Sequence, residues 1–296
     1  MLTRSQRVSL AGGAGRSVLA AASDALFPFF STREAAQALR GVCREFAGAV
    51  ARHAWRDRKT VIKGSIAAWR ASFPRAKAAN VTNSEYAPAR RAIPVVDADF
   101  VHFEGLQFLN MNVCSKVTDA AFAHLKCIRE LFMYYCDQIA ITDAAFANLK
   151  GIHTLRMYGC NQATITDAAF ANLKGIHTLD MSRCSQATIT DAAFANLNGI
   201  HTLSMSSCNQ ATITDAAFAN LEGIHTLDMG GCNQAAITDA AFTHLGGIHK
   251  LNMDRCNQAT ITGATFSCLV GAEKVGMAGC SAVVIAAARA LGLHVV

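Results

Sequence analysis

The stretch ITDAAFANLKGIHTLDMSRC, residues Ile165–Cys184, decides the fold because the chain repeats it almost unchanged over most of its length. Cysteine closes each copy, and the first interval between these cysteines is 22 residues while the others are 24. They are Cys114, Cys136, Cys160, Cys184, Cys208, Cys232, Cys256 and Cys280. A fixed period of this length predicts a solenoid, in which each repeat buries its apolar face only against its neighbours.

Each repeat combines two periodicities. Leu155 and Met157 keep the two-residue spacing of a short strand with one buried face. After a turn, Thr166 or Asp167 is placed to cap a short helix, whose apolar residues lie three apart on one face. Gly175 follows as the residue that ends this helix. Each unit is therefore predicted to be one β-α step.

Composition and charge restrict the class of protein. The chain has 296 residues, of which 52% are hydrophobic and 16% charged, so it is expected to fold. It has no apolar run of the ~18 residues that a membrane span needs. Residues 1–94 hold 16 Lys/Arg against 5 Asp/Glu, a balance that suits an acidic protein or nucleic acid. Nucleic acid is disfavoured because the basic segment has neither interleaved aromatic residues nor zinc-finger spacing.

The cysteine count indicates the redox compartment. Eleven cysteines are an odd number, no hydrophobic signal segment precedes them, and their regular placement is typical of buried thiols that pack as small apolar residues. We therefore expect a reducing compartment, cytoplasmic and/or nuclear. Residues 1–17 are predicted to be a mobile basic tail, although the arginines and the lack of acids in residues 1–23 also fit an organellar transit peptide.

The strand pattern, with leucines, a methionine and a final cysteine followed by Ile-Thr-Asp, resembles the cysteine-containing subfamily of leucine-rich repeats. The resemblance covers residues 95–296 in about eight rungs. It implies an α/β leucine-rich-repeat solenoid with parallel strands on the concave side and short helices on the convex side.

The N-terminal block resembles a second family. Residues 24–55 combine an apolar ALFPFF stretch, a Ser-Thr-Arg-Glu helix start and a helix with an apolar stripe, and they resemble an F-box. We assign residues 18–56 to an F-box-like helical domain and residues 57–94 to a helical linker or N-terminal cap. An F-box implies binding to a Skp-type adaptor on a cullin scaffold, here through Leu26, Phe29, Phe30, Leu39, Val42 and Phe46.

Variation between repeats indicates where a target would bind. The buried positions hardly change, whereas the positions beside each methionine, which the leucine-rich-repeat fold places on the concave face, differ from copy to copy. Aromatic and basic residues gather on two adjacent rungs, and such residues dominate binding hot spots. The predicted target site comprises Phe132, Tyr134, Tyr135, Arg156, Tyr158, Asp180 and Arg183. Neutral drift at exposed positions is the alternative reading.

Cysteine, aspartate and histidine each recur at one position of the repeat, and each of these columns is a candidate metal site. A straight column of cysteines does not converge on a metal, the aspartates are explained by helix capping, and the histidines by a half-exposed rim. Phosphate-binding loops, nucleophile elbows and metal-spaced His/Glu pairs do not occur in the sequence. We therefore predict a non-catalytic protein without cofactor or metal. It is read as the target-binding subunit of an SCF-type ubiquitin ligase or, alternatively, as a free-standing interaction scaffold.

Overall fold

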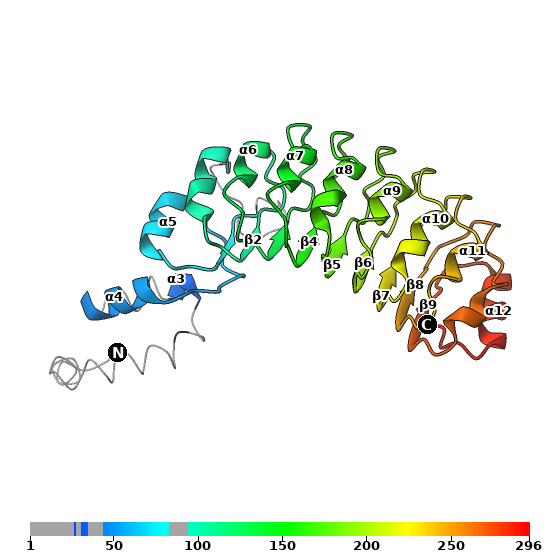
Figure 1. Cartoon of the computed structure of the whole chain (residues 1–296). Helices are drawn as coiled ribbons and strands as arrows, with labels where there is room; N and C mark the ends of the chain where they lie inside the picture. Colours follow the sequence, from blue (N-terminus) through cyan, green and yellow to red (C-terminus); the bar gives the residue numbers. More distant parts are fainter. Residues whose placement is uncertain (1–26, 28–30, 35–43, 83–93) are drawn as a thin grey trace, which may run out of the picture.

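The chain forms an arc of stacked rungs (Figure 1). The computed structural model describes residue 27, residues 31–34, residues 44–82 and residues 94–296. One parallel sheet of nine strands runs through these residues, and its strands follow one another in sequence order. They are β1 (Ala78–Asn80), β2 (Phe108–Asn110), β3 (Glu130–Phe132), β4 (Thr154–Arg156), β5 (Thr178–Asp180), β6 (Thr202–Ser204), β7 (Thr226–Asp228), β8 (Lys250–Asn252) and β9 (Lys274–Gly276).

Short helices cover the convex side of the sheet (Figure 1). Six of them have the sequence DAAF: α6 (Asp119–Phe122), α7 (Asp143–Phe146), α8 (Asp167–Phe170), α9 (Asp191–Phe194), α10 (Asp215–Phe218) and α11 (Asp239–Phe242). The 3-10 helices are η3 (Asp97–Phe103), η4 (Ala171–Leu173), η5 (Ala219–Leu221) and η6 (Phe266–Leu269). The arc closes with α12 (Ala282–Ala290). The leucine-rich-repeat solenoid predicted from the sequence is confirmed.

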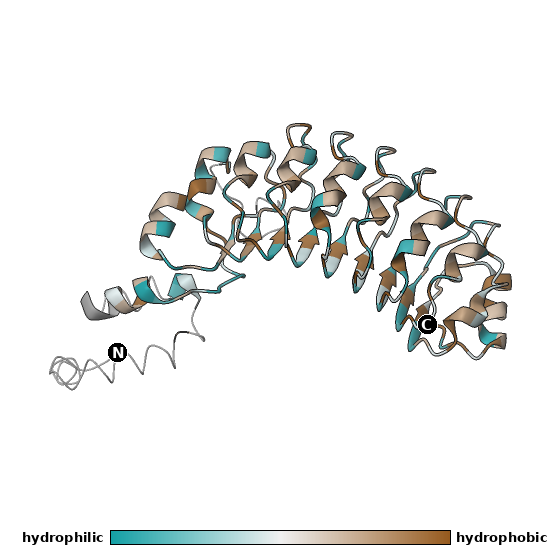
Figure 2. Ribbon diagram, viewed as in Figure 1, coloured by the Kyte–Doolittle hydropathy of each residue, from teal (hydrophilic) through white to brown (hydrophobic). Residues whose placement is uncertain are grey.

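The core is one apolar column between sheet and helices. In Figure 2 brown segments mark the hydrophobic residues on both the strands and the helices. In the rung that begins with α9, the side chains of Phe194, Leu203, Met205 and Cys208 are completely buried. Burying one such phenylalanine or leucine contributes about 1.5–3 kcal/mol. Because each rung has only its two neighbours for this burial, the stability of the arc depends on contacts between successive rungs.

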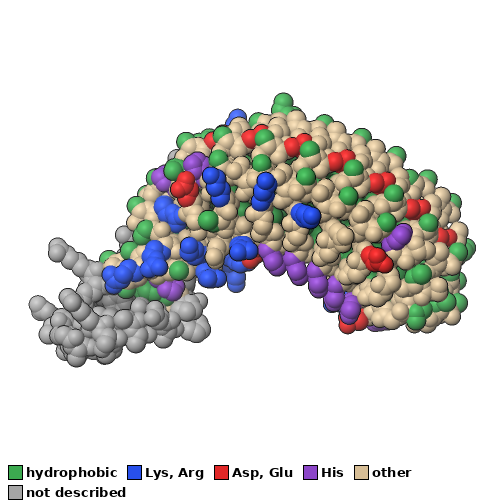
Figure 3. Space-filling view, in the orientation of Figure 1, with side chains coloured by type: hydrophobic (Ala, Val, Ile, Leu, Met, Phe, Trp, Pro, Cys, Tyr) green, Lys and Arg blue, Asp and Glu red, His purple; other side chains and the backbone are tan. Residues whose placement is uncertain are grey.

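Aspartates connect the rungs on the helical side, where Figure 3 shows a regular row of carboxylates. Thr190, not Asp191, caps α9, because its side chain accepts the Ala192 amide. The Asp191 carboxylate instead accepts the amide and the hydroxyl of Thr214 on the next rung, both at 2.7 Å. The prediction that capping explains the aspartate column is therefore wrong. The sequence pattern could not reveal it, because the partner lies one full repeat away.

The segment before the repeats supplies the first strand of the sheet. The described helices there are α3 (Thr32–Glu34), α4 (Arg44–Arg52) and α5 (Ile66–Ser72). Strand β1 lies within residues 57–94, the predicted helical linker or cap, and it pairs with β2 as the first strand of the sheet. Buried Trp55 donates its indole N–H to the Val50 carbonyl at 2.7 Å and joins α4 to this end of the arc. In the parts of the chain that the structure describes, we find no helix long and apolar enough to cross a membrane.

Candidate functional site on the concave face

The strand residues alternate between the core and the concave surface. Leu155 and Met157 are fully buried, whereas Arg156 and Tyr158 between and beside them keep part of their surface exposed. This alternation follows from the pleat of a strand, which points successive side chains to opposite faces. The variable positions found in the sequence therefore do lie on the concave face.

Four aromatic side chains of the predicted target site form a continuous chain of ring contacts. Phe132 and Tyr134 stack with their centroids 6.2 Å apart and an interplanar angle of 3°. Tyr134 contacts Tyr158 at 5.8 Å, and Tyr135 meets Tyr158 edge-on at 5.2 Å. Tyr135 is 47% exposed. The rings thus present a preformed apolar surface that a partner can cover.

Two arginines lie on these rings. The Arg156 guanidinium is 4.8 Å from the Phe132 ring centroid and donates to the Tyr134 hydroxyl at 3.4 Å. Arg183 lies 5.4 Å from the Tyr158 ring centroid. We name the set Phe132, Tyr134, Tyr135, Arg156, Tyr158 and Arg183 the aromatic–basic cluster. Asp180 is the register partner of Arg156 on β5 and borders the cluster.

The cluster is partly shielded from water, and this shielding raises the pKa of two of its tyrosines. Partial burial raises the pKa of Tyr134, although the Arg156 beside it acts in the opposite direction. Desolvation and the neighbouring Tyr135 raise the pKa of Tyr158. Both hydroxyls therefore stay protonated at neutral pH and remain able to donate hydrogen bonds to a partner.

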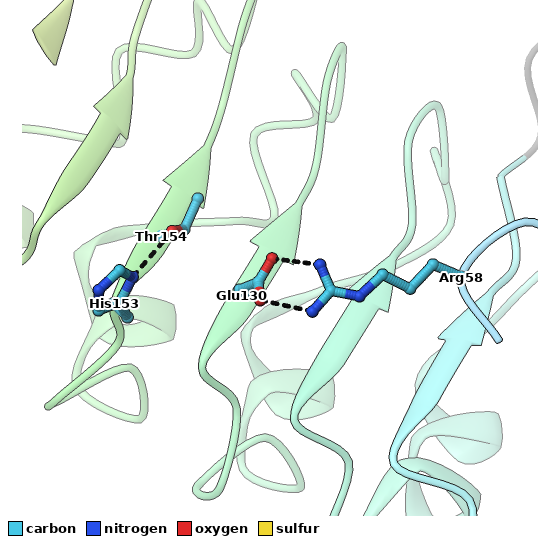
Figure 4. Close-up of polar contacts among 4 residues, drawn as sticks. All are labelled: Arg58, Glu130, His153 and Thr154. Carbon is cyan, nitrogen blue, oxygen red and sulfur yellow. Dashed lines mark hydrogen bonds and ion pairs between the residues drawn. The ribbon is translucent and has the colours of Figure 1, made fainter. Parts of the chain in front are cut away.

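The cluster extends further than the sequence prediction. Phe108 on β2 meets the Phe132 ring at 5.1 Å, and Arg58 lies 4.5 Å from the centroid of the Phe108 ring. Arg58 also forms a bidentate ion pair with Glu130, with distances of 2.6 and 2.7 Å (Figure 4). Sequence reasoning missed these residues because Arg58 lies outside the repeats. Its approach to β3 depends on the path of the N-terminal segment.

One rim of the concave face carries the histidine column, the purple row of Figure 3. Five imidazoles stack with centroids 4.1–4.6 Å apart and interplanar angles of 12–15°, those of His153, His177, His201, His225 and His249. Each Nδ1 lies near the hydroxyl of the threonine that follows, where one is present, as His153 does at 3.2 Å from Thr154 (Figure 4). Parallel rings direct their lone pairs side by side, so they do not converge on one metal ion. Slight desolvation and the adjacent imidazoles lower the pKa of His177.

The cysteine column lies in the core. Its members are buried, as predicted, except for the partly exposed Cys280, and each Sγ approaches a main-chain carbonyl one rung back. Cys208, for example, is 3.1 Å from the Met181 carbonyl oxygen. Burial raises the pKa of the Cys136 and Cys184 thiols to about 12. The described residues contain no group of three or more His, Cys, Asp or Glu arranged to hold a metal.

The opposite rim is formed by residues with left-handed backbone, which we name the left-handed column. Glycine occupies this position at Gly159, Gly231 and Gly279, where φ is +69° to +76°. Side chains occupy it at Val113, Tyr135, Arg183, Ser207 and Arg255, where φ is +53° to +61°. A non-glycine residue in this conformation costs roughly 1–2 kcal/mol, a cost that glycine avoids at the same position.

The predicted adaptor-binding residues lie outside what the structure describes. Leu26, Phe29, Phe30, Leu39 and Val42 fall outside the described ranges, as does the side chain of Phe46, whose backbone belongs to α4. The boundaries at residues 17, 56 and 94 also remain predictions.

Comparison with known proteins agrees with the repeat geometry. The family described as BspA type leucine rich repeat region matches residues 115–249 in six copies. TLR13 in its complex with ssRNA13 superposes with a TM-score of 0.57 at 17% identity, over 71% of this chain and 30% of that chain. The Toll–Spatzle complex of Drosophila gives a TM-score of 0.57 at 14% identity, over 80% of this chain and 31% of that chain.

The chain thus spans less than a third of the length of either structure, and the likeness concerns the fold alone. No curated protein matches the chain by sequence. The nine-stranded parallel sheet, the buried Leu-Met-Cys column of its repeats and the repeat-family match together identify this chain as a leucine-rich-repeat solenoid.

Proposed function

We propose that this protein is a non-catalytic recognition scaffold that binds a partner protein on its concave face. The observation that carries the proposal is the aromatic–basic cluster, in which rings from neighbouring rungs touch and remain partly exposed. Aromatic and arginine side chains contribute most of the energy at interfaces, because they bury a large area and still form hydrogen bonds. The rigid sheet holds them in place before binding, which lowers the entropy lost on association.

The contrast between scaffold and surface supports the same proposal. The core residues of successive rungs are nearly identical, whereas the concave positions change from Phe132 and Arg156 to Asp180 and Ser204 along one column. A fixed framework with a varied inner face suits selective recognition of one protein better than chemistry repeated in every rung.

Affinity purification tests this function. We expect the tagged protein to retain a partner that Tyr134→Ala/Tyr158→Ala loses, while Lys150→Ala/Lys174→Ala, altered at exposed loop positions, retains it. Far-UV circular dichroism of each variant checks that the fold persists. Equal retention by both double variants would remove the concave cluster from the function.

We propose in addition that the scaffold serves as the target-binding subunit of an SCF-type ubiquitin ligase in the cytoplasm and/or nucleus. The support is the resemblance of residues 24–55 to an F-box, together with the placement of cysteine-type repeats after it. The mechanism would be proximity, because holding a target beside a ubiquitin-charged enzyme raises its effective concentration.

A recombinant Skp-type adaptor tests this second proposal directly. We expect the full chain to bind the adaptor, and Phe30→Asp and Leu39→Asp to abolish the binding without affecting partner capture by the arc. An adaptor that does not bind the wild-type chain would leave the free-standing scaffold as the function.

A further inference from the structure

A shallow hollow lies beside the aromatic–basic cluster, toward the C-terminal rungs of the concave face. Its volume is about 350 Å³, and its lining includes Tyr158, Arg183, Ser207, Gly231, Asp254 and Arg255. Arg183 and Arg255 both belong to the left-handed column, and the two residues between them in that column are Ser207 and Gly231. Small residues therefore form the floor, with one arginine toward each end.

The two arginines are free to bind a ligand. In the described part of the chain, neither guanidinium takes part in a hydrogen bond or an ion pair; Arg183 only rests on the Tyr158 ring. Arg255 does not pair even with Asp254, its neighbour in sequence. Unpaired guanidinium groups with fixed backbones are suited to bidentate recognition of carboxylate or phosphate.

The acids near the hollow are already used by the sheet. Asp254 accepts the Ala278 amide at 2.7 Å. Asp228 accepts the Gly230 amide at 3.0 Å and the Asn252 side-chain amide at 3.0 Å. Neither carboxylate forms an ion pair with Arg183 or Arg255 in the described residues, so both guanidinium groups stay available to a ligand.

Both arginines have the left-handed backbone of their column. Arg183 and Arg255 have φ of 57° and 59°, whereas glycine meets the same requirement in other rungs without the cost. Val113 and Ser207 share this conformation, so the unpaired guanidinium groups, and not the backbone, distinguish the two arginines from the rest of the column. The Arg255 side chain leans over Gly279, whose added Cβ would lie 3.3 Å from Arg255 Cγ, so the neighbouring rung leaves space for it.

The distance between the two arginine backbones sets the separation expected between two acidic groups of a ligand. Residues 183 and 255 lie three rungs apart, which is about 14 Å at the ~4.8 Å separation of strands. An extended chain covers that distance in about four residues, and its residues i and i+4 point to the same side. We propose that the hollow binds an extended protein segment with two acidic side chains four residues apart, one at each arginine.

This inference rests on the proposed function, because the segment would continue onto Tyr158 of the aromatic–basic cluster. Glutamate, aspartate or a phosphorylated side chain could supply the acidic group, since all present oxygens to a guanidinium. Comparing the binding of peptides that carry glutamate, aspartate or a phosphorylated residue at both positions identifies which acidic group the hollow prefers.

The test is selection of a random dodecapeptide library on the full-length protein, in parallel with three variants. Arg183→Gln/Arg255→Gln removes the two cations, Tyr134→Ala/Tyr158→Ala removes the rings, and Lys150→Gln/Lys174→Gln removes two exposed charges elsewhere as the matched control. Wild-type protein should enrich acid pairs at a separation of four. A synthetic peptide with this pair should bind the arginine variant at least tenfold more weakly, and the lysine variant should bind it as the wild type does.

The outcomes separate this inference from the function on which it rests. Peptides that need the tyrosines but carry no acid pair would overturn the inference and leave the concave binding site standing. Peptides that need neither the tyrosines nor the arginines would overturn both. Equal loss in the arginine and lysine variants would reduce the effect to nonspecific charge and also overturn the inference. Stronger binding of a phosphoserine pair than of a glutamate pair would support it and identify the phosphorylated segment as the natural source.

Discussion

Replacing Gly159 by alanine tests how the aromatic–basic cluster is built without altering any of its members. Gly159 has φ of +69°, and an added Cβ would lie 2.7 Å from two ring carbons of Tyr135. The exposed Tyr135 ring must therefore move, and its edge-on contact with Tyr158 at 5.2 Å must be lost. The substitution thus acts on backbone strain and on the cluster together.

The expected loss in the free energy of unfolding is the sum of the backbone strain and the lost ring contact. A left-handed alanine in place of glycine costs roughly 1 kcal/mol after its lower unfolded-state entropy is counted. Loss of an aromatic edge contact adds about 0.5–1.5 kcal/mol. We therefore expect Gly159→Ala to lower the free energy of unfolding by about 2 kcal/mol. Gly175→Ala is the matched control, because Gly175 has φ of +81° with nothing within 4 Å of its Cβ; it should cost about 1 kcal/mol.

Urea unfolding followed by circular dichroism and by intrinsic fluorescence measures both variants. Coincident transitions are required, because a repeat array can unfold in parts. Combining Gly159→Ala with Tyr135→Ala should reduce the cost at Gly159 to that at Gly175. Equal losses for Gly159→Ala and Gly175→Ala in the wild-type background would refute the packing of Tyr135 over Gly159.

Three other predictions concern the columns. Burial raises the pKa of the Cys136 thiol to about 12, so iodoacetamide at pH 8 should label exposed Cys127 but not Cys136 in the folded protein, as peptide mass spectrometry would report. The pKa values of His177 and His225 are lowered in the fold, so the unfolded chain binds protons first. The stability due to these residues is complete above their ordinary value of 6.5 and is lost as pH falls below it. The urea midpoint should therefore drop between pH 7.5 and 5, and His177→Asn/His225→Asn should flatten that slope. Asp191→Ala removes two hydrogen bonds from the next rung and should cost about 2 kcal/mol in urea unfolding; an unchanged midpoint would contradict the inter-rung role.

The sequence predicted the repeating unit well because its determinants are local. Leu155 and Met157 mark a strand by their spacing, and Gly175 marks the end of a helix by its backbone freedom. Repetition then placed these elements in register, since identical rungs can only stack by matching equivalent residues. For the same reason the contacts between Phe132, Tyr134 and Tyr158 could be expected before any coordinates.

Features that depend on the next rung or on unrepeated segments were not predictable. The carboxylate of Asp191 binds Thr214, which is 23 residues away. Of the two residue types expected to cap the helix, the threonine does so, here Thr190. Strand β1 was missed because Ala78–Asn80 has neither the leucine nor the methionine of the repeats. The left-handed backbone at Arg183 and Arg255 was equally hidden, because arginine gives no sign of it in a sequence.

The central claim is that the concave cluster is where a partner protein binds, and site-specific photo-cross-linking tests it most directly. Benzoylphenylalanine is introduced at Tyr158 on the concave face and, in a matched protein, at exposed Ala171 beside the convex helix α8. The account predicts that a partner retained by the wild-type chain is cross-linked from position 158 and not from position 171. Cross-linking from position 171 with none from position 158 would contradict it.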